Sequence, residues 1–333
     1  MTFAKFLIKR AVHGLVVAWA ALTIIFLLRF LSPFDVVTAL IPPEVAPSAR
    51  EGLIKDLGLD QPMHIQYLNY LAGVLRGDLG FSYHSRIDVV DLMIDRLPAT
   101  VELAATATLV SVVLSIPLGV ISAIRRHKFA DHSASLFALL GISTPNFWLG
   151  IMLVLLLSVH FNFFPTSGRP IGFVPAVVML LTEFRPSGLL MWMHYMTLPA
   201  VTLGTYYVAL LTRLTRGEML EQLGQGYVRV LRAKGLPETL VTLNHVLRNS
   251  LLPIVTVVGL QFGSLLNGAV VVEVVFRWPG LGEMVIRAIN ALDWPVIQGV
   301  LIVVAIAWVI INTVVDIVYS QVDPRITLEG GSR

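Results

Sequence analysis

The chain has 333 residues, of which 56% are hydrophobic and only 14% are charged, and its mean hydropathy is +0.79. Soluble domains carry about 25% charged residues, so this composition excludes an ordinary soluble protein and favours a membrane protein. The net charge of +3 gives no reason to expect a nucleic-acid partner, and the absence of cysteine excludes disulfides, thiolate metal sites and a cysteine nucleophile.

The first predicted element is a membrane-spanning helix over residues 11–31. Its apolar run reaches the roughly 20 residues that a bilayer requires, and three basic residues precede it. A cleaved signal peptide is the alternative, because residues 18–20 fit the small-residue cleavage rule. Cleavage there would leave only a short apolar core, whereas the apolar run continues to Leu31, which favours an uncleaved span.

Residues 32–98 are predicted to form an extracytoplasmic cap. Apolar and aromatic side chains such as Leu57, Tyr67 and Leu71 recur at helical spacing, so the segment is expected to fold. It is either a surface for a partner or a structural lid over the helices.

Five further spans follow the cap, and prolines inside them are tolerated because neighbouring helices satisfy the freed carbonyls. Residues 171–193 are ambiguous. As a span they would place Glu183 and Arg185 near the membrane centre, at a cost of about 2.5–3.5 kcal/mol each, so we interpret them as an extracytoplasmic loop. The five spans cover about 99–124, 133–161, 196–213, 250–275 and 296–320.

The basic residues orient these spans. The segments predicted to face inward hold 14 lysines and arginines, and those predicted to face outward hold nine, as the positive-inside rule requires. The sequence therefore predicts an all-α polytopic membrane protein with six transmembrane helices and both termini in the cytoplasm. Its parts are residues 1–98 (first span and cap), 99–320 (transmembrane core) and 321–333 (cytoplasmic tail).

The sequence does not contain the motifs of several functional classes. No GxxxxGK[ST] loop, HExxH or GxSxG is present, and the eight histidines are scattered. A membrane enzyme is therefore disfavoured. A self-contained secondary transporter or channel is disfavoured as well, since no span carries a chain of buried charges.

The inward-facing loop over residues 217–249 contains a charged, helix-prone stretch, "GYVRVLRAKGLPE" at 226–238. Val228, Leu231 and Leu236 supply an apolar edge, and Gly235 and Pro237 are expected to end the helix. From the residues alone, this helix either occupies a groove on a partner or touches anionic lipid headgroups.

The stretch from residue 226 to 263 resembles the cytoplasmic-loop signature of ABC importer permeases, in the branch that handles dipeptides, oligopeptides and nickel. "DLGLDQPMHIQYLNYLAGVLRGDLGFSY", "STPNFWLG", "VVVEVVFRWPGLGEMVIRAINALDWPVIQG" and the closing "DPRI" are similar to the same branch. The long first outer loop matches the B-type, first permease subunit. The chain departs from the general Glu-Ala-Ala loop pattern, since residues 229–231 read Arg-Val-Leu.

The resemblance implies a type I ABC importer permease in a prokaryotic cell membrane, without enzymatic activity or a cofactor of its own. It implies as partners a second homologous permease, two cytoplasmic ABC ATPases that bind ATP and Mg, and an extracytoplasmic substrate-binding protein. Small peptides are the expected substrate, with nickel chelates, glutathione-like peptides and oligosaccharides as alternatives. The residues implied to couple the chain to the ATPases are Tyr227, Arg229, Arg232, Ala233, Lys234, Gly235 and Leu236.

Two further sets are candidate functional residues. Gln261, Ser264, Asn267 and Gly268 lie on or near one face of the fifth span and either line the pathway or pack helices. Glu102 and Glu273, near the outer ends of the second and fifth spans, either line the mouth of the pathway or cap interhelical contacts, and we favour the second role. The outer segments together with Glu273, at the outer end of the fifth span, hold thirteen acids against nine basic residues. Asp88, Asp91 and Asp95 are the candidate receptor-docking residues among those acids.

Overall fold

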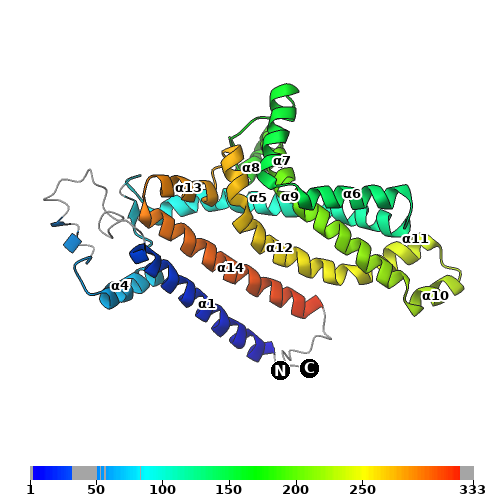
Figure 1. The fold of residues 1–333 in the computed structure, drawn as a ribbon, viewed down its shortest axis with the longest axis horizontal. Coiled ribbons are helices and arrows are strands. Elements are labelled where there is room, and N and C mark those ends of the chain that lie inside the picture. The colour runs from blue at the N-terminus through cyan, green and yellow to red at the C-terminus, as the bar shows by residue number, and fades with distance from the viewer. Residues whose placement is uncertain (1–2, 32–50, 53, 56–57, 83, 323–333) are drawn as a thin grey trace. The chain divides into compact units, whose positions relative to one another are not determined.

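The computed structural model describes residues 3–31, 51–52, 54–55, 58–82 and 84–322. This part of the chain is almost entirely helical, as expected (Figure 1). Residues 32–50 of the expected cap and 323–333 of the expected tail lie outside the described residues. The elements are α1 (Phe3–Leu31), α4 (Met63–Arg76), β1 (Phe81–Ser82), β2 (Ile87–Asp88), α5 (Val89–Ile124), α6 (Phe129–Ser143), α7 (Asn146–Leu153), η1 (Val154–His160), α8 (Phe173–Glu183), α9 (Ser187–Leu223), α10 (Gly226–Ala233), α11 (Glu238–Leu240), η2 (Val241–Val246), α12 (Leu247–Phe276), α13 (Leu281–Asn290) and α14 (Trp294–Val322).

Four helical stretches in the described part of the chain are long and apolar enough to cross a membrane, and a bent pair of helices makes a fifth candidate. The expected fourth span, residues 196–213, lies inside α9, which is not among these candidates. The central part of α9 is buried, and its threonines Thr202 and Thr212 lie inside the protein. The four stretches are Arg10–Leu28, Val89–Ile124, Glu238–Leu265 and Trp294–Val315.

The segment predicted as the third span is broken. Helix α6 and the helix formed by α7 and η1 meet at an angle of 105° at Thr144 and Pro145. Thr144 is extended, with φ −87° and ψ 123°, as residues before proline favour. Its hydroxyl and its N–H both donate to the Leu140 carbonyl, at 2.7 and 2.9 Å. Residues 133–161 are therefore not one continuous helix, because Thr144 takes an extended conformation before Pro145.

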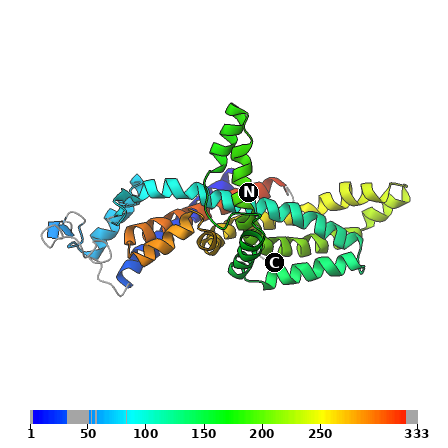
Figure 2. The ribbon, with the colours of Figure 1, turned by 90° about the horizontal axis from the view of Figure 1, so that it is seen from above.

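The segment 171–193, predicted as an extracytoplasmic loop, contains two helical pieces: α8 and the first turns of α9. Helix α8 packs against α9 (Figure 2). It ends where Phe184 takes a left-handed conformation. With 11 residues, α8 is about 16 Å long, far shorter than the roughly 30 Å of a bilayer core. Glu183 and Arg185 lie exposed at the turn, 3.6 Å apart. The two charges thus end a short helix and do not interrupt a long one.

The chain divides into two compact units. Unit 1 comprises Met1–Thr100 and Pro279–Thr313, and unit 2 comprises Val101–Trp278 and Val314–Arg333. In unit 1 the first turns of α5 pack against α13 and α14 around Val89 and Met93. Strands β1 and β2 pair as an antiparallel ribbon. The Ser82 hydroxyl of this ribbon donates to Asp293, in the turn between α13 and α14, at 2.5 Å.

Unit 2 is organised around α9, and small residues bring its helices together. The Ser111 hydroxyl of α5 donates to the Gly204 carbonyl of α9 at 3.1 Å. A Cβ on Gly204 would lie 3.0 Å from the Ala107 carbonyl oxygen, and one on Gly259 would lie 2.9 Å from Val315. Such small-residue contacts are typical of helix packing in membranes.

Candidate functional site

The charged stretch at residues 226–238, hereafter the basic segment, forms the connection between α9 and α12 (Figure 1). Gln225 is extended and precedes α10, which runs from Gly226 to Ala233. After Pro237, the short α11 and η2 lead directly into α12. The predicted helix is therefore present, and both of its ends are joined to long helices of unit 2.

Helix α10 ends in a hydrogen-bonded glycine motif. Gly235 has φ +76°, a left-handed conformation that glycine adopts at low cost. The Gly235 N–H donates to the Arg232 carbonyl at 2.9 Å, and the Leu236 N–H donates to the Leu231 carbonyl at 3.4 Å. These are the two bonds of a Schellman motif. The prediction that Gly235 ends the helix is confirmed.

The predicted apolar edge holds α10 in place. Val228 is fully buried, and Leu231 and Leu236 pack against the same hydrophobic cluster. We call this set the anchoring cluster. Its buried members come from α5, α9, α10 and η2, and they are Val120, Ala123, Met219, Val228, Val241 and Val246.

The opposite face of α10 is charged and exposed. Arg229, Arg232 and Lys234, hereafter the basic face, are exposed, and so are Ala233 and Gly235. Of the other predicted coupling residues, Tyr227 and Leu236 are partly buried against the anchoring cluster. The basic segment therefore combines a buried apolar edge with a solvent-facing basic surface.

The prediction omitted Val230, whose side chain is 54% exposed between the basic residues. Helical periodicity indicates this placement, because Val230 lies away from the face of Val228 and Leu231. An exposed apolar side chain within a basic face gives a partner a hydrophobic contact as well as charge.

An ion pair closes the end of the basic segment. The Arg232 guanidinium donates to both carboxylate oxygens of Glu238, with its Nε at 3.0 Å and a terminal nitrogen at 2.5 Å. These hydrogen bonds raise the pKa of Arg232 above its ordinary value. Both side chains are about half exposed, so the pair orients α10 relative to α11 and adds little stability.

A second charge pair in unit 2 is buried. The Asp131 carboxylate of α6 accepts two hydrogen bonds from Arg216 of α9, at 2.6 and 2.9 Å. It also accepts the Ser122 hydroxyl of α5 at 2.5 Å and the His127 N–H at 2.9 Å. We call this the Asp131 network. Its hydrogen bonds raise the pKa of Arg216. The sequence analysis did not identify it, since Asp131 and Arg216 are 85 residues apart.

Glu102 joins several elements of unit 2, as expected for an interhelical contact. Its carboxylate accepts two hydrogen bonds from Arg169, at 3.1 and 2.7 Å. It also accepts the Phe173 N–H that begins α8, at 2.9 Å, and the Trp192 indole N–H of α9, at 3.3 Å. Glu102 therefore fixes the start of α8 against α5 and α9. Glu273, the other acid expected in this role, is fully buried in α12.

The three acids predicted to contact a receptor lie together in unit 1. Asp88 ends β2, and Asp91 and Asp95 lie one turn apart on α5. All three are exposed, while Val89 and Met93 on the other face of α5 are buried in the core of the unit. We call these acids the outer acidic patch.

The predicted pathway residues all lie in α12. Ser264 is exposed, with its hydroxyl directed to the Leu260 carbonyl at 3.4 Å, and Gln261 is partly buried. The side chains of Asn267 and Gly268 are outside those that the structure describes. Across the described ranges, no three histidine, aspartate or glutamate side chains gather as metal ligands.

Comparison with known proteins agrees with the resemblance. The dipeptide transport system permease protein DppB of Escherichia coli (strain K12) is 44% identical over 296 residues, covering 85% of this chain and 86% of that protein. The oligopeptide transport system permease protein AppB of Bacillus subtilis (strain 168) is 37% identical over 324 residues, covering 97% and 99%. The predicted similarity to this branch of permeases is confirmed.

A solved structure of the MetNI methionine ABC transporter, in inward-facing conformations, matches with a TM-score of 0.54 at 15% identity. The match covers 70% of this chain and 96% of that chain, and it supports the fold. Two family models match the sequence: the N-terminal region of binding-protein-dependent transport system membrane components at residues 3–104, and the inner membrane component itself at residues 115–328. The chain therefore belongs to the family of binding-protein-dependent transport system inner membrane components.

Proposed function

We propose that this permease is the first, B-type subunit of an ATP-driven importer that carries small peptides across the cell membrane of a prokaryote. The observation that carries the proposal is the basic segment, a helix whose apolar edge is buried and whose basic face is exposed to a partner. The relatives named for dipeptide and oligopeptide transport support peptides as the cargo.

In this proposal the chain crosses the membrane six times, with both termini in the cytoplasm. The excess of basic residues in the inward segments supports this orientation. The first span and its cap (1–98) and the transmembrane core (99–320) then bring the basic segment to the cytoplasmic side and the outer acidic patch to the other side.

The basic segment docks on one of two cytoplasmic ATPase subunits, which bind ATP and Mg. Arg229, Arg232 and Lys234 meet acids on the ATPase, and Val230 contacts an apolar part of the groove. Closure of the ATPases around ATP moves α10, and the anchoring cluster passes the movement to α5 and α9. Shifting the permease from mostly inward-facing to mostly outward-facing requires about 5.5 kcal/mol of preference for the closed state.

Cargo arrives from an extracytoplasmic binding protein that docks on the outer acidic patch. It then passes between this chain and a homologous permease, along the α12 face of Gln261, Ser264, Asn267 and Gly268. Exposed acids of this kind mainly raise the association rate of a basic partner, and this increase becomes smaller as the salt concentration rises.

The test is transport by the complex that copurifies with a tag on this chain, reconstituted in liposomes with its binding protein. Uptake of a labelled dipeptide that requires ATP and the binding protein is the expected result. A panel of glutathione, a nickel chelate and an oligosaccharide tests the other cargo classes. Uptake of one of these without any uptake of peptides would refute the peptide assignment.

A further inference from the structure

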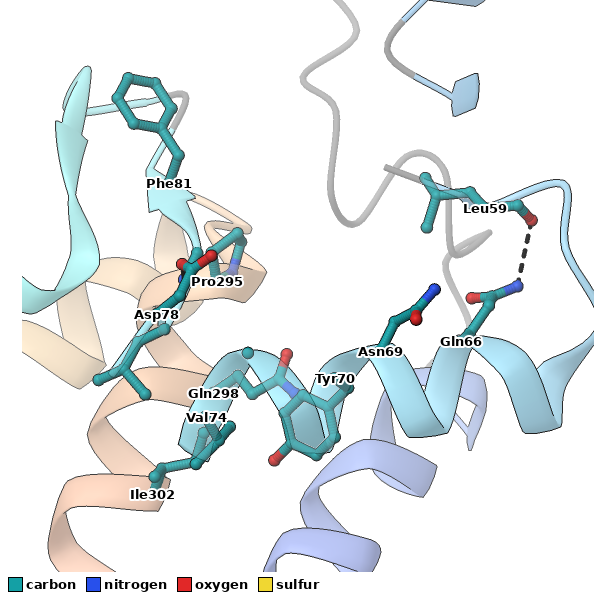
Figure 3. Close-up of a pocket in the computed structure, with 13 residues that line it drawn as sticks. Leu59, Gln66, Asn69, Tyr70, Val74, Asp78, Phe81, Pro295, Gln298 and Ile302 are labelled. Atoms are coloured by element: carbon teal, nitrogen blue, oxygen red, sulfur yellow. Dashed lines mark hydrogen bonds between the residues drawn. The ribbon is translucent and has the colours of Figure 1, made fainter. Parts of the chain in front are cut away.

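Unit 1 contains a cavity of about 250 Å³ between α4, the turn at residues 77–81 and the start of α14. Figure 3 shows Asn69 and Tyr70 of α4 on one side, and Asp78 and Gln298 on the other. Gln298 lies four residues, about 6 Å, into α14. With the topology proposed above, the cavity opens to the extracytoplasmic side.

Gln298 makes this cavity more than a packing defect. Its side chain is 7% exposed, and its amide nitrogen has no hydrogen-bond partner among the described residues. A buried donor without an acceptor is costly, and in native structures such a group is usually satisfied by water or a ligand. An acceptor that enters the cavity would remove this cost.

The rest of the lining has the composition of a binding site. The carboxylate of Asp78 is exposed at the rim, where its Oδ1 accepts the Gly80 N–H at 2.9 Å. Val74 and Ile302 add apolar surface. A few polar groups placed on an apolar wall are typical of small-ligand pockets.

From these groups we infer that the cavity binds a short peptide of two or three residues. A peptide carbonyl or carboxylate oxygen accepts from the Gln298 amide, the N-terminal ammonium pairs with Asp78, and an apolar side chain rests on Val74 and Ile302. At about 30 Å³ per water, the cavity has room for roughly eight waters. That volume suits a dipeptide and is too small for a folded segment.

This inference rests on the proposed peptide cargo and gives the permease a site of its own on the entry side. A peptide released by the binding protein would be held here before it enters the pathway. Because the site contains one ammonium partner and one buried amide donor, it selects for the free N-terminus and the backbone, and it tolerates different side chains.

The test is binding of the dipeptide alanyl-phenylalanine to the copurified complex in nanodiscs, without binding protein, followed by saturation-transfer NMR. Gln298→Met keeps the length of the side chain and removes the donor, and Asp78→Asn keeps the acceptor for Gly80 and removes the charge. Gln298→Met is expected to weaken binding about tenfold. Asp78→Asn is expected to weaken it about threefold, because the carboxylate is exposed at the rim. Asp60→Asn, an exposed acid of unit 1 outside the cavity lining, is the control and should leave affinity unchanged.

N-acetylation of the dipeptide should weaken binding to the wild type about threefold and have little effect in Asp78→Asn, because both changes remove the same ion pair. Absence of binding without the binding protein, or equal affinity in all three variants, would overturn the inference. Dipeptide uptake by the liposome system in that case would leave the proposed function standing. Loss of peptide uptake with binding intact would overturn the proposed function alone.

Discussion

Removal of the Asp131 carboxylate is expected to destabilise the permease by about 3 kcal/mol. In Asp131→Ala, the guanidinium of Arg216, the hydroxyl of Ser122 and the N–H of His127 lose their acceptor. Removing one partner of a buried ion pair costs about 3–5 kcal/mol. The Arg216 side chain is 28% exposed, so water reaches it, and the loss should lie at the lower end of that range.

Thermal unfolding of the purified protein, followed by tryptophan fluorescence, measures this loss. A domain of 150–250 residues loses about 2–4 °C per kcal/mol, so the midpoint should fall by about 6–12 °C. Asp131→Leu combined with Arg216→Met replaces both charges with apolar groups and should recover most of the loss, since no unpaired charge remains. Asp131→Leu and Arg216→Met should therefore be strongly non-additive.

Glu238→Gln provides the matched control, because it removes the acid of the exposed pair with Arg232. Exposed pairs contribute about 0–1 kcal/mol, and the midpoint should barely move. If Asp131→Ala unfolds within about 1 °C of the wild type, or if the two changes simply add, the Asp131 network does not hold the helices as we argue.

Further predictions concern the proposed contacts with partners. Gly235→Val should reduce copurification of the ATPase more than Gly235→Asn, because the left-handed conformation costs most side chains about 1–2 kcal/mol and asparagine less; equal yields would exclude a role for the helix end. Arg232→Glu with Lys234→Glu should abolish transport and leave membrane insertion intact, whereas normal transport would make the basic face a lipid contact. Changing the outer acidic patch to asparagines should slow association of the binding protein at low salt and have little effect at high salt. The purified chain alone should hydrolyse no ATP, and activity that survives removal of contaminants would contradict the proposal.

The basic segment could be predicted in detail because its determinants are local. The spacing of Val228 and Leu231 defines a helix face, and Gly235 before Pro237 defines its end. Helix formation, the burial of one edge and the exposure of the basic residues follow from these few positions. The exposure of Val230 could have been predicted from the same periodicity.

Other features could not be predicted because they depend on tertiary contacts or on competition between local interactions. Asp131 and Arg216 carry no pattern that pairs them across 85 residues. Proline alone does not identify a break, since Pro199 and Pro253 lie inside continuous helices while Pro145 ends one. The difference at Pro145 lies in the preceding residue: Thr144 is extended, whereas the residues before Pro199 and Pro253 remain helical.

The anchoring cluster and the Asp131 network occupy the same turns of the same helices. In α5, Ser122 of the network is adjacent to Ala123 of the cluster, and in α9, Arg216 lies one turn before Met219. A displacement of α10 moves Val228 and so acts on the adjacent turns of α5 and α9. The polar residues of those turns, Ser122 and Arg216, are hydrogen-bonded to Asp131 of α6. Close-packed interiors and hydrogen-bonded charge pairs resist gradual deformation. Helices α5, α6 and α9 should therefore move together when a partner docks at the basic face. The apolar edge and the buried ion pair thus give unit 2 a mechanical connection from the proposed ATPase contact to three of its helices.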